Sequence, residues 1–183
     1  MSWKSDSSNN FKELSSFIGD YWKIYGGWYE LVRSPFFLVA LALLILTFST
    51  WTSIKWWDDV IGVIPDIVGF TIGGYAIILV FGGEQFRSAL SGSSSKEPSP
   101  YLQVNVAFVH FISMQVLALL FALVVKSWFA GSKSLGFMGV IVSGFGYGLF
   151  LYSLLCAVAA AFALLKVSKW YDVYTNGQSK DDE

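Results

Sequence analysis

The feature that most constrains the fold is a series of long runs without a charged residue. Four such runs occur, at 34–54, 67–83, 101–125 and 134–165. A helix crosses the ~30 Å hydrocarbon core of a bilayer with about 20 predominantly apolar residues. The sequence therefore predicts an all-α integral membrane protein with four transmembrane helices.

The composition favours the same class and excludes others. Hydrophobic residues make up 55% of the chain and charged residues 14%, whereas a soluble domain carries about 25% charged residues. The formal net charge of -1 argues against nucleic acid, which is bound through a basic face. The single cysteine, Cys156, lies in an apolar run, so an intrachain disulfide and a thiolate metal cluster are excluded. We expect neither a metal nor a cofactor.

The four predicted spans form two hairpins, at 34–83 and 101–171. Residues 84–100, rich in serine and proline toward their end, form a linker between the hairpins. Residues 172–183 form a polar tail. The spans are predicted at 35–51, 65–83 and 101–125 and within 134–165.

The N-terminal segment, 1–33, precedes the first span. From Phe11 to Trp28 apolar side chains recur every three or four residues, and polar side chains take the opposite face. This pattern predicts an amphipathic helix that lies in the membrane interface and is ended by Gly26 and Gly27. The alternative is a helix that packs on a partner subunit or on another part of the fold. Its apolar face holds Phe11, Leu14, Phe17, Ile18, Tyr21, Trp22, Tyr25 and Trp28.

The distribution of lysine and arginine predicts the orientation. With four spans, nine basic residues fall on the side of the termini and the linker, and three fall on the other side. Basic residues concentrate on the cytoplasmic side, so we expect a cell-membrane protein with both termini in the cytoplasm. The nine are Lys4, Lys12, Lys23, Arg33, Arg87, Lys96, Lys166, Lys169 and Lys180, and the three are Lys55, Lys126 and Lys133.

Asp66 is the one carboxylate close to an apolar run. An ionisable group in a membrane is a functional candidate, and small dimeric four-helix exporters use a single carboxylate well inside their first helix. Asp66, however, follows Pro65, where the second span is predicted to begin. A negative side chain there interacts with the positive end of the helix dipole. We favour this structural role over a coupling role.

His110, the only histidine, lies in the third predicted span together with Asn105, Ser113 and Gln115. A histidine titrates near neutral pH, so a proton relay or a gate is one interpretation. A neutral histidine that forms hydrogen bonds between helices is the interpretation we favour.

Glycine spacing predicts close helix contacts. Gly69 and Gly73 in the second span, next to Gly74, and Gly144 and Gly148 in the fourth are each four residues apart. This spacing lets a neighbouring backbone approach closely. The contacts can lie within one chain, between chains, or both.

Three tryptophans, Trp51, Trp56 and Trp57, surround the connection between the first two spans. Indole rings are common at the membrane interface, and we assign them there. The alternative is an aromatic site for a cationic ligand, backed by Asp58 and Asp59.

The motifs of common enzymes are missing from the sequence. It contains no HExxH, GxSxG, P-loop or CxxC motif, so we expect no catalytic activity and no catalytic residues. A bundle of this size has little room for a substrate cavity within a single chain. The leading hypothesis is a homo-oligomeric inner-membrane protein that forms a pore or alters membrane permeability, with an uncharged lining gated by wetting.

Two other functions remain open. One is a non-catalytic anchor or scaffold subunit that binds a larger membrane or cytoplasmic partner through the amphipathic segment and the linker. The other is a small proton- or cation-coupled carrier that uses Asp66 or His110.

Overall fold

A computed structural model describes residues 3–53, 55–92, 97–129, 131–132 and 134–181. Every regular element among these residues is an α-helix, which confirms the predicted all-helical class. The elements are α1 (Trp3–Tyr25), α2 (Gly27–Arg33), α3 (Pro35–Leu46), α4 (Phe48–Trp51), α5 (Trp56–Val80), α6 (Gly83–Ser91), α7 (Pro100–Phe129) and α8 (Phe137–Asp181).

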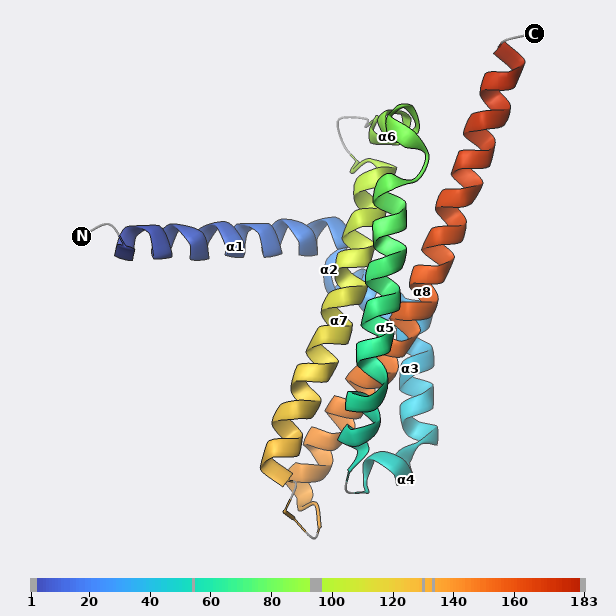
Figure 1. The fold of residues 1–183 in the computed structure, drawn as a ribbon. Helices are drawn as coiled ribbons and strands as arrows, with labels where there is room; N and C mark the ends of the chain where they lie inside the picture. The colour runs from blue at the N-terminus through green and yellow to red at the C-terminus, as the bar shows by residue number, and fades with distance from the viewer. Residues whose placement is uncertain (1–2, 54, 93–96, 130, 133, 182–183) are drawn as a thin grey trace.

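Three of these helices, α5, α7 and α8, are long and apolar enough to cross a membrane, and they pack side by side (Figure 1). A fourth crossing exists only if α2 and α3 count as one broken span, because their axes are bent by 57°. Ser34 separates the two helices in an extended conformation, with ψ 126°, as is usual for a residue that precedes proline. The arrangement of four spans in two hairpins therefore stays a prediction.

The predicted continuous helix over 35–51 is wrong. Helix α3 ends at Leu46, and the short α4 follows Thr47. The Thr47 hydroxyl donates to the Leu43 carbonyl at 2.7 Å, and the Trp51 indole N–H donates to the Leu44 carbonyl at 2.8 Å. These side chains satisfy the last carbonyls of α3, so the helix can end within an apolar run.

The predicted start of the second span at Pro65 is also wrong. Helix α5 begins at Trp56, and Pro65 lies inside it. Asp58 and Asp59 occupy the first turn of α5, where negative charge meets the positive end of the helix dipole. Asp66 is thus ten residues into the helix, about 15 Å along its axis.

The other end of α5 turns sharply at two glycines. Gly82 and Gly83 have φ values of 77° and 70°, a conformation that glycine adopts at little cost. The chain then enters α6, whose Phe86 is buried against Tyr171 of α8, with ring centroids 5.2 Å apart. Arg87 donates to the Leu79 carbonyl at 2.9 Å and so caps α5.

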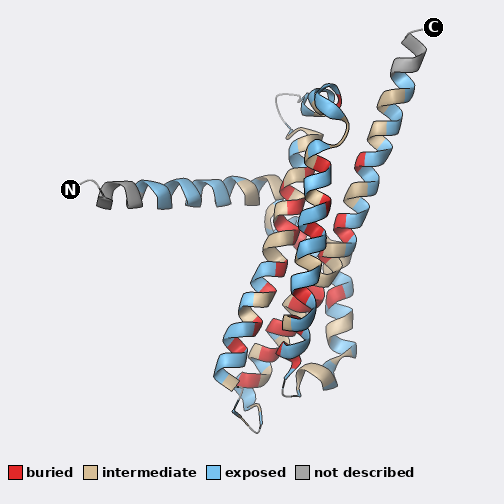
Figure 2. Ribbon diagram, viewed as in Figure 1, coloured by how far each residue is buried: buried red, intermediate tan, exposed pale blue. Residues whose placement is uncertain are grey.

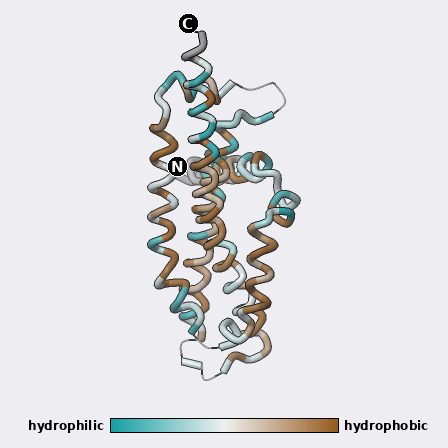
Figure 3. Tube along the Cα trace, turned by 90° about the vertical axis from the view of Figure 1, so that its right-hand side faces the viewer, coloured by the Kyte–Doolittle hydropathy of each residue, from teal (hydrophilic) through white to brown (hydrophobic). Residues whose placement is uncertain are grey.

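The core lies where α5, α7 and α8 meet (Figure 2). Val60, Ile64, Phe108 and Ala122 have exposed fractions of 0%. The outer surface of the same helices is also apolar (Figure 3). An apolar exterior around a packed interior is expected of helices surrounded by lipid.

Two helices extend away from this bundle (Figure 1). Helix α1 points outward across the long axis of the bundle, and α8 continues past α6 toward the C-terminus. At 45 residues, α8 is about 68 Å long, far more than a bilayer core requires. Part of the predicted polar tail, up to Asp181, is therefore helical.

Candidate functional site

His110 lies at the crossing of α1, α7 and α8. The Tyr21 hydroxyl of α1 is 2.7 Å from its Nδ1, and the Tyr152 hydroxyl of α8 is 2.9 Å from its Nε2. The Tyr25 ring stacks on the imidazole, with centroids 3.9 Å apart. We call Tyr21, Tyr25, His110 and Tyr152 the His110 cluster.

The geometry of the His110 cluster suits a neutral imidazole. A neutral imidazole has one donor and one acceptor nitrogen, and a hydroxyl can take either role. Burial raises the pKa of Tyr21 to about 12, so this hydroxyl keeps its proton near neutral pH. The cluster is therefore a hydrogen-bonded joint between α1 and the bundle, and the neutral state of His110 stays a prediction.

Only one member of this cluster was a candidate in the sequence. Tyr21 and His110 are 89 positions apart, so no local spacing relates them. The available signals were the four-residue spacing of Tyr21 and Tyr25 and the phenol of Tyr152 within an apolar run that also holds Tyr147. Ser113, which shares a helix face with His110, forms no hydrogen bond with it.

Gln115 forms a second polar link, between α7 and α5. Its exposed fraction is 0%, and its amide N–H donates to the Thr71 hydroxyl at 3.0 Å. Its Oε1 has no hydrogen-bond partner among the described residues. Asn105 lies elsewhere on α7 and donates to the Tyr101 carbonyl at 2.8 Å, with its Oδ1 likewise unpaired. The four polar candidates thus do not form one site.

Asp66 is exposed on the outer side of α5. Gly62, Gly69 and Gly73 lie on the same helix face, because the spacings of four, three and four residues return to one side. A Cβ added at any of these three glycines would meet no atom within 4 Å. Asp66 makes no hydrogen bond or ion pair within the described ranges. We call Gly62, Asp66, Gly69 and Gly73 the open face of α5.

The remaining predicted glycines are covered from within the chain. A Cβ at Gly74 would lie 3.2 Å from Leu164. On α8, a Cβ at Gly144 would lie 3.1 Å from the Trp51 ring, and one at Gly148 would lie 3.2 Å from Leu44. Gly146, which the spacing did not single out, is the tightest of the α8 glycines, against Trp56 and Phe121.

Two of the three predicted interfacial tryptophans, Trp56 and Trp57, pack inside the protein at one end of the bundle, whereas Trp51 is half-buried. Trp56 and Trp57 have exposed fractions of 2% and 1%, and the Trp56 indole donates to Ser143 at 2.9 Å. Asp58 is paired with Lys126 at 2.9 Å. The two buried rings therefore offer no open aromatic face to a cationic ligand.

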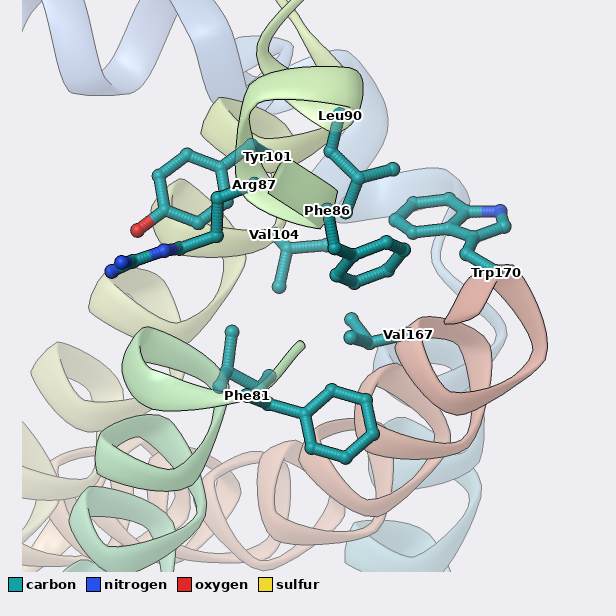
Figure 4. Close-up of a pocket in the computed structure, with 9 residues that line it drawn as sticks. Phe81, Phe86, Arg87, Leu90, Tyr101, Val104, Val167 and Trp170 are labelled. Carbon is teal, nitrogen blue, oxygen red and sulfur yellow. The ribbon is translucent and has the colours of Figure 1, made fainter. Parts of the chain in front are cut away.

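The side chains between α5, α6 and α8 enclose a further small space (Figure 4). Phe81, Phe86 and Val167 converge on it, and Arg87 and Trp170 lie at its margin. Its volume is about 10 Å³, which is room for one water at most. It is a packing gap and not a ligand site.

Comparison with protein-family models, with curated proteins and with solved structures gave no match. The functional argument therefore rests on the geometry alone. Within the described ranges, no group of three or more His, Cys, Asp and Glu side chains could hold a metal ion.

Proposed function

We propose that the protein is a multi-pass membrane protein that associates with copies of itself and makes the membrane permeable to cations. The observation that carries this proposal is the open face of α5. It combines a carboxylate with three glycines whose surroundings are empty.

The charged end of the bundle supports one position for the bilayer. Lys126 and Asp58, paired at 2.9 Å, suit one boundary of the membrane. About 20 residues cross the hydrocarbon core, so the opposite boundary lies near Val106 on α7. In this position α1 lies in the interface on that side, and α6 and the end of α8 lie beyond the lipid. Asp66 is eight residues from Asp58, about 12 Å into the core.

A carboxylate at that depth would face lipid at a substantial cost in free energy. Insertion scales assign a charged residue at the centre of a spanning helix a cost of about 2.5–3.5 kcal/mol. Self-association relieves the cost by turning Asp66 toward other copies and toward water between them. The glycines let the helices approach closely. A ring of carboxylates favours cations over anions, in place of the uncharged lining expected from the sequence.

Flux through liposomes tests the proposal. We expect purified protein to admit potassium in preference to chloride, and Asp66→Asn to remove most of that preference. Asp59→Asn is the matched control, because Asp59 is an exposed carboxylate in the first turn of the same helix. If liposomes that contain folded oligomers admit no ions, the protein does not form a pore. If Asp66→Asn and Asp59→Asn show the same preference for potassium over chloride, Asp66 does not line the pore.

The second candidate function is a non-catalytic subunit that anchors a larger partner. The observation that favours it is the length of α8, which continues past the bundle (Figure 1). This candidate predicts a stable partner that co-purifies with the full chain and is lost when residues 176–183 are removed. Retention of the partner by the shortened chain would contradict docking on this extension.

A further inference from the structure

A notch of about 360 Å³ opens where α1 meets the bundle. Its walls are apolar, from Ile24 of α1, Val104 and Ala107 of α7 and Ala163 of α8. Two polar side chains also line it, Gln103 and Lys166. The volume falls within the range typical of small-molecule sites.

The notch lies in the headgroup layer if the bilayer has the position given above, and this inference rests on that part of the proposed function. Gln103 and Val104 are close to the boundary near Val106, and α1 lies beside them in the interface. A recess that is apolar on its walls is poorly filled by water. A lipid molecule is the neighbour available at that depth.

The charge at one end of the notch sets the sign of the ligand. The Lys166 ammonium lies 4.9 Å from the centroid of the Trp170 ring, one turn farther along α8, a cation–π contact that leaves its charge available to a ligand. Gln103 uses one amide hydrogen on the Pro98 carbonyl, at 2.8 Å, and keeps a second. Both side chains can therefore donate to an anion.

The neighbouring charges localise that anion. Lys169 follows Lys166 by one turn of α8, and Lys23 precedes Ile24 on α1. Glu97 is exposed next to Pro98, whose carbonyl accepts from Gln103, so an anionic group is favoured nearer to Lys166 than to Gln103. Basic pockets between spanning helices on the cytoplasmic side are a known setting for lipid headgroups.

We propose that this notch binds an anionic phospholipid, with the phosphate of its headgroup on Lys166 and its apolar part against Ile24, Ala107 and Ala163. Free phosphate offers the charge without the apolar part, and a zwitterionic lipid offers the apolar part with a weaker net attraction. An anionic phospholipid offers both.

Native mass spectrometry of the full chain in detergent tests the proposal, with phosphatidylglycerol and phosphatidylcholine added in turn. We expect one phosphatidylglycerol to be retained in preference to phosphatidylcholine. Lys166→Gln should weaken retention about fivefold, the effect of one lysine at a lipid surface. Lys12→Gln is the matched control, because Lys12 is exposed on α1 well before Ile24. Inorganic phosphate should not displace the lipid.

A second variant tests the apolar part of the notch. Ala163→Phe should fill the notch and release the lipid, with folding checked by circular dichroism. Equal retention of the two lipids, equal effects of Lys166→Gln and Lys12→Gln, or unchanged retention by a folded Ala163→Phe would overturn the proposal. Displacement by phosphate would also overturn it, since the site would then be an ion site. The assay needs no flux, so selective retention with silent liposomes would keep this inference while the pore fails.

Discussion

The glycines of α5 and α8 follow the same local pattern and have different surroundings. On α8, Gly144 and Gly148 lie against Trp51 and Leu44 of the same chain. On α5, Gly69 and Gly73 lie against nothing within 4 Å. A glycine spacing of four therefore indicates a surface suited to close approach, and the rest of the fold decides whether that surface is already used.

The glycines of α8 and α5 also differ in what they contribute to the stability of the fold. The α8 glycines make room for rings and branched side chains, and so contribute to packing within one chain. The α5 glycines forgo the helix propensity of alanine, about 1 kcal/mol each, without any contact in return. Asp66 on the same face adds the cost of a charge near lipid. In the proposed membrane position, the open face of α5 is consequently a surface that a second copy would stabilise.

Cross-linking should separate the two glycine faces most clearly. With Gly69→Cys, a short bifunctional thiol reagent should join most chains in membranes, because the proposed self-association brings the open face of α5 against another copy. Leu117→Cys is the matched control, at a similar depth but on α7 with 49% exposure, and should give little product. The parent chain supplies the blank, since Cys156 is 1% exposed. Equal yields from the two cysteines would show that the open face of α5 is not a preferred contact.

Replacing a glycine with alanine should change the free energy of unfolding in opposite directions on α8 and on α5. A Cβ at Gly146 would lie 2.6 Å from the Phe121 ring and would also overlap Trp56, so Gly146→Ala should lower the free energy of unfolding by about 1–3 kcal/mol. Gly69→Ala meets no atom of its own chain, so in detergent that keeps the protein monomeric it should raise the free energy of unfolding by up to ~1 kcal/mol through helix propensity. Unfolding in mixed detergent, followed by circular dichroism, measures both. A loss in Gly69→Ala equal to that in Gly146→Ala would mean that the open face is packed.

The class of fold could be predicted from the sequence, because charge-free runs report directly on the solvent that surrounds a helix. The helix ends could not. Pro65 has a local preference for a first turn, but Asp58 and Asp59 supply the first turn of α5 instead. Thr47 and Trp51 end α3 through side-chain bonds that no apolar count reveals.

The candidate site was predictable only in its single members. His110 stood out as the only histidine, whereas its partners Tyr21 and Tyr152 are brought to it by the crossing of three helices. The glycines stood out by spacing, but what covers each of them depends on α3 and α4, which bring Leu44 and Trp51 against α8. Long-range packing therefore decides which local signals become contacts.

A substitution on the packed side of α5 should change the free energy of unfolding by less than the glycine substitutions do. Thr71 lies there, with 0% exposure, and accepts the amide N–H of Gln115 at 3.0 Å. Thr71→Val keeps the shape and removes the acceptor, so it should cost about 1 kcal/mol, near the typical value of a hydrogen bond between membrane helices. Gln115→Leu in the same background should then cost less than it does alone. Additive losses in this double-mutant cycle would mean that the bond contributes nothing.

Removing the exposed ion pair at the start of α5 should change the free energy of unfolding least, so it serves as the reference for substitutions on the packed and open faces of the helix. Asp58 and Lys126 are paired at 2.9 Å, but their side chains are 48% and 46% exposed. Exposed pairs of this kind contribute about 0–1 kcal/mol, so Lys126→Gln should change the free energy of unfolding by less than Thr71→Val does. Raising the salt concentration should narrow the gap to the parent chain, because screening weakens an exposed pair in the parent and leaves the variant unchanged. If Lys126→Gln instead lowered the free energy of unfolding by several kcal/mol, and did so in high salt as well, the first turn of α5 would be held by more than an exposed ion pair. The first turn would then belong to the packed part of α5.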